Sequence, residues 1–270
     1  MMLSYSAFKW MARLLGGAVA IGAFALAAGT ANAATITVTT ALDEFDLSPN
    51  ATCSLREAIE SANRNSDFGG CMGSGAYGAD TIVFTPTISV ITLTITSPVG
   101  INNDNNAYLD LDVVVDSLAT NVFTLTIQGS SNAPVKVTRD YTSDPQFSDR
   151  IFDILTPTLG LRPGGVRFAY LFIEAGQAVG NEETVSNDHP CHQGGAGVRH
   201  RSGGLLEIES GTVSFNFANG NGGGICQDGG QLRVLNYTYI AKNTSKFYQR
   251  RRPLYLRHGG DSPRRSRGTM

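Results

Sequence analysis

The strongest constraint on the fold is a repeat near the C-terminal end of the chain. Residues 213–216 (Val-Ser-Phe-Asn) and 240–243 (Ile-Ala-Lys-Asn) share the form apolar-x-x-Asn, and the second segment begins 27 positions after the first. Two further pairs of segments recur at this step or at one position less: 195–198 with 222–225, and 203–208 with 229–234. Self-similarity of this length is typical of stacked units, none of which can bury its apolar face alone.

Short β-branched segments separated by Gly, Pro, Asn and Asp make up most of the remaining chain. We expect strands at residues 34–41, 80–84, 88–95, 109–115, 123–127, 135–138, 151–155 and 166–173. The 31 Gly, the 10 Pro and a charged fraction of 16% suit a turn-rich all-β chain. A sandwich of hairpins and a solenoid of β-coils both give such a pattern. The absence of tight Asn-Gly hairpin turns between adjacent segments, together with the repeat, favours the solenoid.

A solenoid places equivalent residues of successive coils above one another. Its interior is then filled by rows of apolar side chains. Asn216 and Asn243 are expected to form an Asn ladder, in which each amide bonds to the next coil. The repeated glycines would allow positive φ angles and close backbone approach at the turns.

Residues 1–33 have the features of a signal peptide. Lys9 and Arg13 supply a positive start, residues 14–28 carry no charge, and residues 31–33 (Ala-Asn-Ala) form a small-x-small cleavage site. The alternative is a membrane anchor, but the apolar segment is shorter than the ~20 residues that a span needs. We therefore expect an exported protein without a transmembrane span in the mature chain, in an environment where disulfides persist.

Residues 54–62 are expected to form the one helix of the mature chain. Ser54 and Glu57 have the spacing of a capping box. The positions that would form one apolar stripe are Leu55, Ala58, Ile59 and Ala62. Arg56 and Glu60 are expected to pair weakly on the exposed side. We expect this helix to cover the N-terminal end of the coils, with Leu55 and Ile59 packed against the first of them.

Cys53 and Cys71 flank this helix and the Gly-rich loop after it. In an exported protein, a disulfide across their 18-residue separation would contribute roughly 3 kcal/mol in the chain-entropy model. The alternative is a metal site, but these cysteines lack the nearby His or further Cys of a zinc motif. We favour the disulfide.

Two other segments suggest metal ligands. His189, Cys191 and His192 are closely spaced, although a disulfide between Cys191 and Cys226 is the favoured interpretation. Residues 102–106 (Asn-Asn-Asp-Asn-Asn) are rich in oxygen ligands but lack a complete calcium-loop motif, so a turn is expected. The chain has no phosphate loop, nucleotide fingerprint, Ser-x-Gly elbow or zinc pair. We expect neither a metal nor a cofactor.

The charge changes sign along the chain. Residues 34–245 contain 11 basic and 22 acidic residues, whereas residues 246–270 contain 8 basic and 1 acidic. An acidic body argues against a nucleic-acid partner, because phosphate binding requires a basic face. The repeat predicts Asn-Gly-Gly-Gly-Leu-Tyr where residues 249–254 read Gln-Arg-Arg-Arg-Pro-Leu, and one DNA sequence encodes both peptides in adjacent frames. We expect the tail to be a frameshifted or disordered segment; the alternative is a basic tail that binds anionic polymer or lipid.

Several motifs resemble those of the CSLREA-domain proteins, and the Gly and Asn repeats resemble those of polymorphic outer-membrane proteins. The segments that carry the resemblance are 53–59 (Cys-Ser-Leu-Arg-Glu-Ala-Ile), 62–63, 70–71, 79–84, 125–129 and 149–154. The resemblance covers roughly residues 35–245, with residues 34–84 as the N-terminal cap region. It implies an exported or surface-located bacterial protein with a right-handed parallel β-helix related to pectin lyases, and it supplies no shared catalytic residues.

Two groups of carboxylates are the nearest candidates for a catalytic site. Asp110 and Asp112, with Asp116 nearby, form the first, and Glu207 and Glu209 form the second. Because side chains at i and i+2 share one face of a strand, each pair can point the same way, as the paired acids of a glycosidase must. Acids on the solvated outer faces of half-buried strands are the simpler explanation, and it is the one we expect.

Two function classes follow. The first is a non-enzymatic β-helix, secreted or held at the cell surface or outer membrane, that contacts extracellular glycans or cell-surface molecules in the manner of an adhesin. The second is a polysaccharide lyase or glycoside hydrolase on the same fold. Residues 162–167 place two Arg beside a Pro, which suits an acidic sugar, although a turn is the simpler interpretation. We favour the first class, since a fold alone does not define a function.

Overall fold

The computed structural model describes residues 33–96, 106–115, 123–140, 149–155, 164–178, 191, 193–201 and 203–246. All of these ranges belong to one unit of the chain. The predicted signal peptide up to residue 32 and the predicted tail from residue 247 lie outside the described residues. Within the described ranges, no helix is long and apolar enough to cross a membrane.

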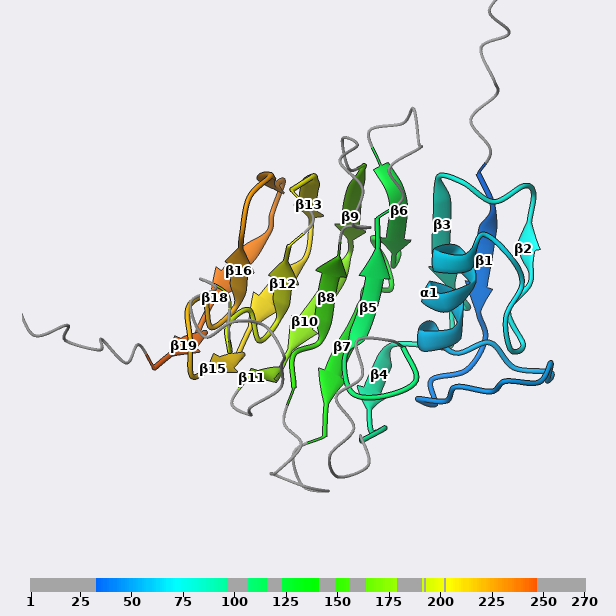
Figure 1. The fold of residues 1–270 in the computed structure, drawn as a ribbon, viewed down its shortest axis with the longest axis horizontal. Coiled ribbons are helices and arrows are strands. Elements are labelled where there is room, and N and C mark those ends of the chain that lie inside the picture. The colour runs from blue at the N-terminus through cyan, green and yellow to red at the C-terminus, as the bar shows by residue number, and fades with distance from the viewer. Residues whose placement is uncertain are drawn as a thin grey trace, which may run out of the picture. The chain divides into compact units, whose positions relative to one another are not determined.

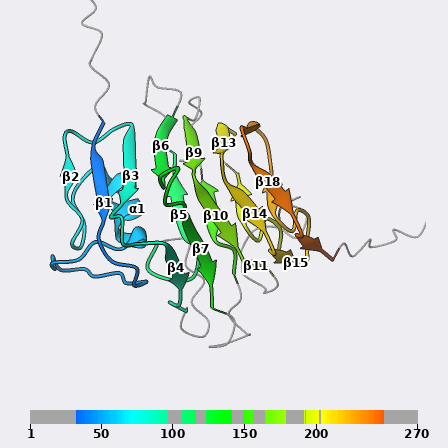
Figure 2. The same cartoon turned by 180° about the vertical axis from the view of Figure 1, so that it is seen from behind.

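Most of the regular structure lies in four β-sheets (Figures 1 and 2). Sheet I contains, in spatial order, β17 (Gln231–Leu235), β13 (Leu205–Glu209), β9 (Gly165–Ala169), β6 (Phe123–Gln128), β3 (Asp80–Phe84), β1 (Thr35–Val38) and β2 (Gly73–Ser74). Sheet II contains β18 (Tyr239–Ala241), β14 (Thr212–Ser214), β10 (Leu171–Glu174), β7 (Val135–Arg139) and β4 (Val90–Leu93). Sheet III contains β16 (Ile225–Gln227), β12 (Val198–His200), β8 (Phe152–Leu155) and β5 (Leu111–Val114), and sheet IV contains β11 (Gln177–Ala178), β15 (Phe217–Ala218) and β19 (Thr244–Ser245).

The strand pairs in these sheets are parallel, apart from the antiparallel pair of β1 and β2. Across the described ranges, α1 (Leu55–Arg64) is the one helix. The prediction of an all-β chain with one short helix is thus confirmed.

The chain visits the sheets in a constant order. From β3 onward it passes from sheet I to sheet II and then to sheet III, and β11 and β15 of sheet IV follow sheet II in the two later complete passages. The registers that match the step of the sequence repeat are Val198 with Ile225, Thr212 with Tyr239, and Phe217 with Thr244. The repeat therefore corresponds to one passage of the chain through all the sheets.

Apolar side chains form rows across neighbouring strands. The row across sheet I consists of Ile36, Ile82, Ile127, Phe168 and Ile208, none of them more than 1% exposed. It ends at Val234 on β17, and a row across sheet II ends at Ile240 on β18; both side chains are 44% exposed. The strands β17 and β18 therefore present apolar positions that earlier strands bury.

Sharp corners join sheet I to sheet II. Tyr170, Ser210 and Asn236 each follow a strand of sheet I directly and have left-handed φ angles of 53°, 50° and 52°. The prediction of one continuous strand over residues 166–173 is therefore wrong, because the chain turns at Tyr170 from β9 into β10. Left-handed φ is uncommon outside glycine, and the β-branched and aromatic pattern of this segment carries no sign of it.

The predicted Asn residues bond to each other and to the backbone of the neighbouring strands. The Nδ2 of Asn216 donates to Oδ1 of Asn243 at 3.0 Å, and the backbone N–H of Gly176 donates to Oδ1 of Asn216 at 2.8 Å. A Cβ at Gly197 would lie 2.9 Å from Nδ2 of Asn216, and a Cβ at Gly224 would lie 2.6 Å from Nδ2 of Asn243. These two glycines recur with the Asn residues because the ladder occupies the space that a side chain would need.

The helix α1 begins with a capping box and lies on the core. The Oγ of Ser54 accepts from the N–H of Glu57 at 3.1 Å, and the Glu57 carboxylate accepts from the N–H of Ser54 at 3.0 Å. Leu55 and Ile59 are buried in the same apolar cluster as the rows of sheet I. This face of α1 therefore covers apolar residues of the strands next to it in Figure 1.

Arg56 is buried, so its predicted exposed pairing with Glu60 is wrong. Its Nε donates to Oδ1 of Asp43 at 2.7 Å and its Nη2 to Oδ2 of Asp43 at 3.2 Å. The same guanidinium donates to the backbone carbonyls of Asn106, Leu109 and Asp110 at 2.9 to 3.1 Å. Arg64 pairs with Glu60 instead. The guanidinium thus links α1 to the segment that leads into β5, a long-range neighbour that helical spacing cannot reveal.

Candidate functional site

The first predicted acid group lies in a buried network of charges on sheet III. Asp110 and Asp112 are 4% and 2% exposed, so the expectation of a solvated outer face is wrong for both. Together with Asp153 on β8 they bring carboxylate oxygens within 4.8 Å of one another. Asp116 lies outside the described residues.

Arginines neutralise this network, which explains how the acids can be buried. Arg199 donates through Nε to Oδ1 of Asp153 at 2.9 Å and also contacts the second oxygen, while Arg201 contacts the same carboxylate. Arg150 lies 3.2 Å from Oδ2 of Asp110. The geometry is that of a structural ion network, in which guanidinium groups take the places that a cation would need around Asp153.

The two ends of the network titrate differently. Burial, and then the charge of Asp149, raise the pKa of Asp110 to about 7. Burial alone would also raise the pKa of Asp153, but the charges of Arg199, Arg150 and Arg201 hold it below its ordinary value. Opposite shifts of neighbouring acids are found in active sites and in structural ion networks alike. Here the burial of both carboxylates favours the structural explanation.

The second predicted acid group lies on β13 and is also ion-paired. Glu207 and Glu209 share one face of the strand, as expected, and both contact Arg167 on β9, with Nε of Arg167 3.3 Å from Oε1 of Glu207. Nη1 of Arg233 on β17 lies 3.9 Å from Oε2 of Glu207. Glu207 is buried rather than solvated. Residues 162 and 163 lie outside the described ranges, so the predicted Arg pair of this segment is described only at Arg167. The expected turn is wrong from Gly165 onward, because Gly165–Ala169 forms β9.

The predicted disulfides are both present. They join Cys53 to Cys71 and Cys191 to Cys226. Cys191 is therefore bonded to sulfur rather than offered to a metal, and His189 and His192 lie outside the described residues.

The candidate calcium segment is described only at its last residue. Residues 102–105 lie outside the described ranges. Asn106 is buried, and its side-chain amide donates to the carbonyl of Asp112 at 2.9 Å while its Oδ1 accepts from the N–H of Asp112 at 2.8 Å. Asn106 therefore supports the start of β5.

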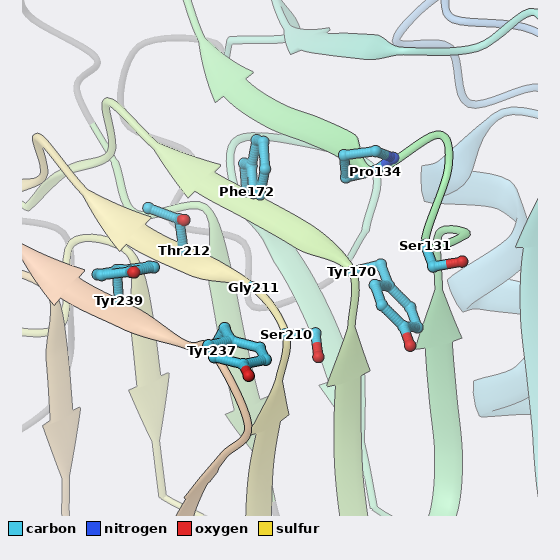
Figure 3. A pocket seen from close by; sticks show the side chains of 9 residues that line it. All are labelled: Ser131, Pro134, Tyr170, Phe172, Ser210, Gly211, Thr212, Tyr237 and Tyr239. Carbon is cyan, nitrogen blue, oxygen red and sulfur yellow. The ribbon is translucent and has the colours of Figure 1, made fainter.

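A groove of about 360 Å³ lies over sheet II and the corners that lead into it (Figure 3). Its lining consists of four aromatic residues, three hydroxyl residues, one proline and one glycine: Tyr170, Phe172, Tyr237, Tyr239, Ser131, Ser210, Thr212, Pro134 and Gly211. None of these nine residues carries a charge. We call this feature the aromatic groove.

The floor of the aromatic groove consists of side chains at equivalent positions on neighbouring strands. Phe172, Thr212 and Tyr239 occupy equivalent positions on β10, β14 and β18, so their side chains lie side by side across three strands. Tyr237 precedes β18 and Tyr239 begins it; the two residues are 86% and 64% exposed. Exposed aromatic side chains cost hydration free energy and are enriched in recognition surfaces.

The chemistry of the groove suits a ligand with both apolar and hydroxyl surface. Flat tyrosine and phenylalanine rings pack against apolar C–H groups, and phenolic, serine and threonine hydroxyls both donate and accept hydrogen bonds. A sugar ring offers such a combination, with C–H groups on its faces and hydroxyls at its rim.

The acid pairs of the sequence do not point to this groove. The available sign in the sequence was the repeat, whose 27-residue step aligns Thr212 with Tyr239 in successive units. Tyr239 begins β18 beside Thr212, whereas Tyr237 lies in the connection before that strand. The position of Tyr170 beside them depends on the left-handed corner, which sequence did not reveal.

Comparisons with known protein families, with characterised proteins and with solved structures find no match to this chain.

Proposed function

We propose that this chain is an exported right-handed parallel β-helix, similar to the CSLREA-domain proteins, that binds an extracellular carbohydrate without transforming it. The aromatic groove is the proposed binding site. The single observation that carries the proposal is a groove lined by four aromatic and three hydroxyl side chains and by no charged one. Recognition sites of this kind fix a ligand by apolar contact and a few polar groups.

The order of the strands supports the β-helix. A coil that passes from sheet I through sheets II and IV to sheet III, and returns to sheet I one repeat later, makes the same contacts at each turn. The Asn ladder and the apolar rows are the side-chain counterparts of that repeat. In this arrangement α1 would serve as the cap of the first coil.

Two observations support export to the cell surface or the medium. The first residues have the pattern of a signal peptide. Two disulfides join all four cysteines, and such bonds persist mainly in oxidising compartments.

Binding without turnover is favoured over catalysis by the placement of the acids. Neither Asp110 and Asp112 nor Glu207 and Glu209 line the aromatic groove. The two aspartates are buried, and both glutamates contact Arg167. A glycosidase needs two carboxylates on either side of the scissile bond.

A glycan array tests the proposal. The full chain would be expressed with its signal segment, and the secreted product would be compared with a Tyr237→Ala, Tyr239→Ala double variant. We expect glycan binding by the unchanged protein and at least a tenfold weaker signal from the double variant, because two stacking platforms are lost. Phe215→Ala is the matched control, since this aromatic is 56% exposed but lies outside the groove. Equal binding by the double variant and the control would reject the groove as the site.

A turnover assay tests the alternative function. The same secreted protein would be incubated with acidic and neutral polysaccharides, and the release of unsaturated or reducing ends would be measured. We expect no release above that from the heat-denatured protein. Sustained release that is lost in a Glu207→Gln variant would establish the lyase or hydrolase instead.

A further inference from the structure

We propose that the ligand of the aromatic groove is an extended, uncharged glycan that runs across the strands, with one sugar residue at each corner. This inference rests on the proposed function and defines the class and the direction of the ligand.

The direction follows from where the lining residues lie along the chain. Ser131 belongs to the β6–β7 connection, Tyr170 to the β9–β10 corner, Ser210 to the β13–β14 corner and Tyr237 to the β17–β18 connection. These connections are successive neighbours, because β6, β9, β13 and β17 are adjacent in sheet I. In Figure 3, Ser210 lies between Tyr170 and Tyr237. The groove therefore crosses the strands rather than following one of them.

The spacing suits an extended chain of sugars. Neighbouring strands lie about 4.8 Å apart, so the four connections span roughly 14 Å. The step from one connection to the next is comparable with the length of one sugar residue in an extended chain. A single sugar would contact one or two of these connections, whereas an oligosaccharide of about four residues would reach all of them.

The side chains of the four connections alternate between hydroxyls and rings, in the order Ser131, Tyr170, Ser210 and Tyr237. Tyr170 and Tyr237 provide rings at separate corners, and Ser210 provides a hydroxyl between them. Rings on either side of a hydroxyl suit a chain whose sugars offer C–H faces at alternate positions and a hydroxyl in between. A compact or highly branched ligand would not match this order.

The charges around the groove argue against an acidic polysaccharide. A carboxylate in the groove would lose hydration without meeting a cation among the lining residues. Lys136 is beside Phe172 in the register of sheet II, but its Nζ lies 4.0 Å from a carboxylate oxygen of Glu174. The acidic body of residues 34–245 would add a long-range repulsion.

The test measures affinity against chain length by calorimetry with the secreted full chain. The probes are glucose, galactose, mannose and xylose oligosaccharides from monomer to hexamer, with glucuronate and galacturonate oligomers of the same lengths. We expect at least one neutral series to bind, with affinity that rises to about the tetramer and then stays constant. We expect the uronate series to bind at least tenfold more weakly.

A variant links the length dependence to the corners. Tyr237→Ala removes the ring at one end, so the affinity of the longest neutral oligomers should fall roughly 3- to 10-fold. The affinity should then stop rising at a shorter length, because one contact is missing. Phe215→Ala, outside the groove, should leave the length dependence unchanged.

The outcomes separate this inference from the proposed function. If a neutral monosaccharide binds as tightly as its tetramer, or if uronates bind more tightly than every neutral series, the extended neutral ligand is wrong while carbohydrate binding stands. If none of the probes binds, and the glycan array is also silent, the proposed function is wrong as well.

Discussion

Replacing Arg56 by Met is expected to destabilise the protein more than any comparable change on the same helix. The side chains of Arg56 and Asp43 are 0% and 1% exposed, and two hydrogen bonds join them. The carboxylate of Asp43 also accepts from the N–H groups of Thr94 and Ile95 at 2.7 and 2.8 Å. Met keeps the length of the side chain but leaves a buried carboxylate without its counter-ion.

The size of the loss in the free energy of unfolding follows from the groups that Arg56→Met leaves without a partner. Removing one partner of a buried ion pair costs about 3–5 kcal/mol of the free energy of unfolding. The backbone carbonyls of Asn106, Leu109 and Asp110 also lose a charged donor. A domain typically has about 5–15 kcal/mol of stability, so Arg56→Met should remove a large part of it.

Arg64→Met is the matched control on α1. Arg64 pairs with Glu60 four residues earlier, its side chain is 51% exposed, and its guanidinium lies 4.5 Å from the ring centre of Phe68. Exposed contacts of this kind are worth about 1 kcal/mol or less. Urea unfolding at pH 7, followed by circular dichroism, gives the free energy of unfolding of both variants.

Two further measurements make the result decisive. A double variant, Asp43→Asn with Arg56→Met, should be more stable than Arg56→Met alone, because no unpaired charge remains. Although burial acts against it, Arg56 holds the pKa of Asp43 below its ordinary value. The stability from this pair is therefore present above about pH 4 and is lost as the pH falls through the folded-state pKa. The difference between the unchanged protein and Arg56→Met should shrink over that range. Equal stabilities of Arg56→Met and Arg64→Met would refute the reasoning.

Three further predictions concern the repeat, the loop and a buried histidine. Asn216→Ala should lower the free energy of unfolding by about 2–4 kcal/mol, because buried backbone groups lose their hydrogen-bond partners. Asn243→Ala, at the more exposed end of the ladder, should lower it by about 1 kcal/mol. Urea unfolding of the two variants measures the difference. Gly70→Ala should cost about 3 kcal/mol or more, because its Cβ would lie 1.6 Å from the carbonyl oxygen of Thr52, and a loss of less than about 1 kcal/mol would contradict that geometry. Burial lowers the pKa of His200 to about 4, so this residue stabilises the fold above about pH 6.5 and that stability is lost as the pH falls toward 4. His200→Gln should make stability less dependent on pH between 6.5 and 4, and an unchanged slope would contradict the shifted pKa.

Much of the fold was predictable because it recurs along the sequence. The step of the repeat, the capping box and the cysteine pairs are local or periodic patterns, and the structure contains each of them. The corners between sheet I and sheet II were harder to predict from the sequence. Tyr170, Ser210 and Asn236 are different residue types in the same left-handed conformation, so no shared residue marks the position.

The candidate site was the least predictable feature, and its origin in the corners explains why. A left-handed residue fixes how the chain leaves sheet I, and so decides which side chains of sheet II lie beside those of the corner. Tyr170 and Tyr237 lie in one groove because both occupy this junction, although they are 67 positions apart in the sequence. The left-handed conformation recurs at the β9–β10, β13–β14 and β17–β18 junctions while the residue varies between Tyr, Ser and Asn. Substitutions at the junctions would therefore change the lining of the proposed binding groove while the Asn ladder and the apolar rows stay in place.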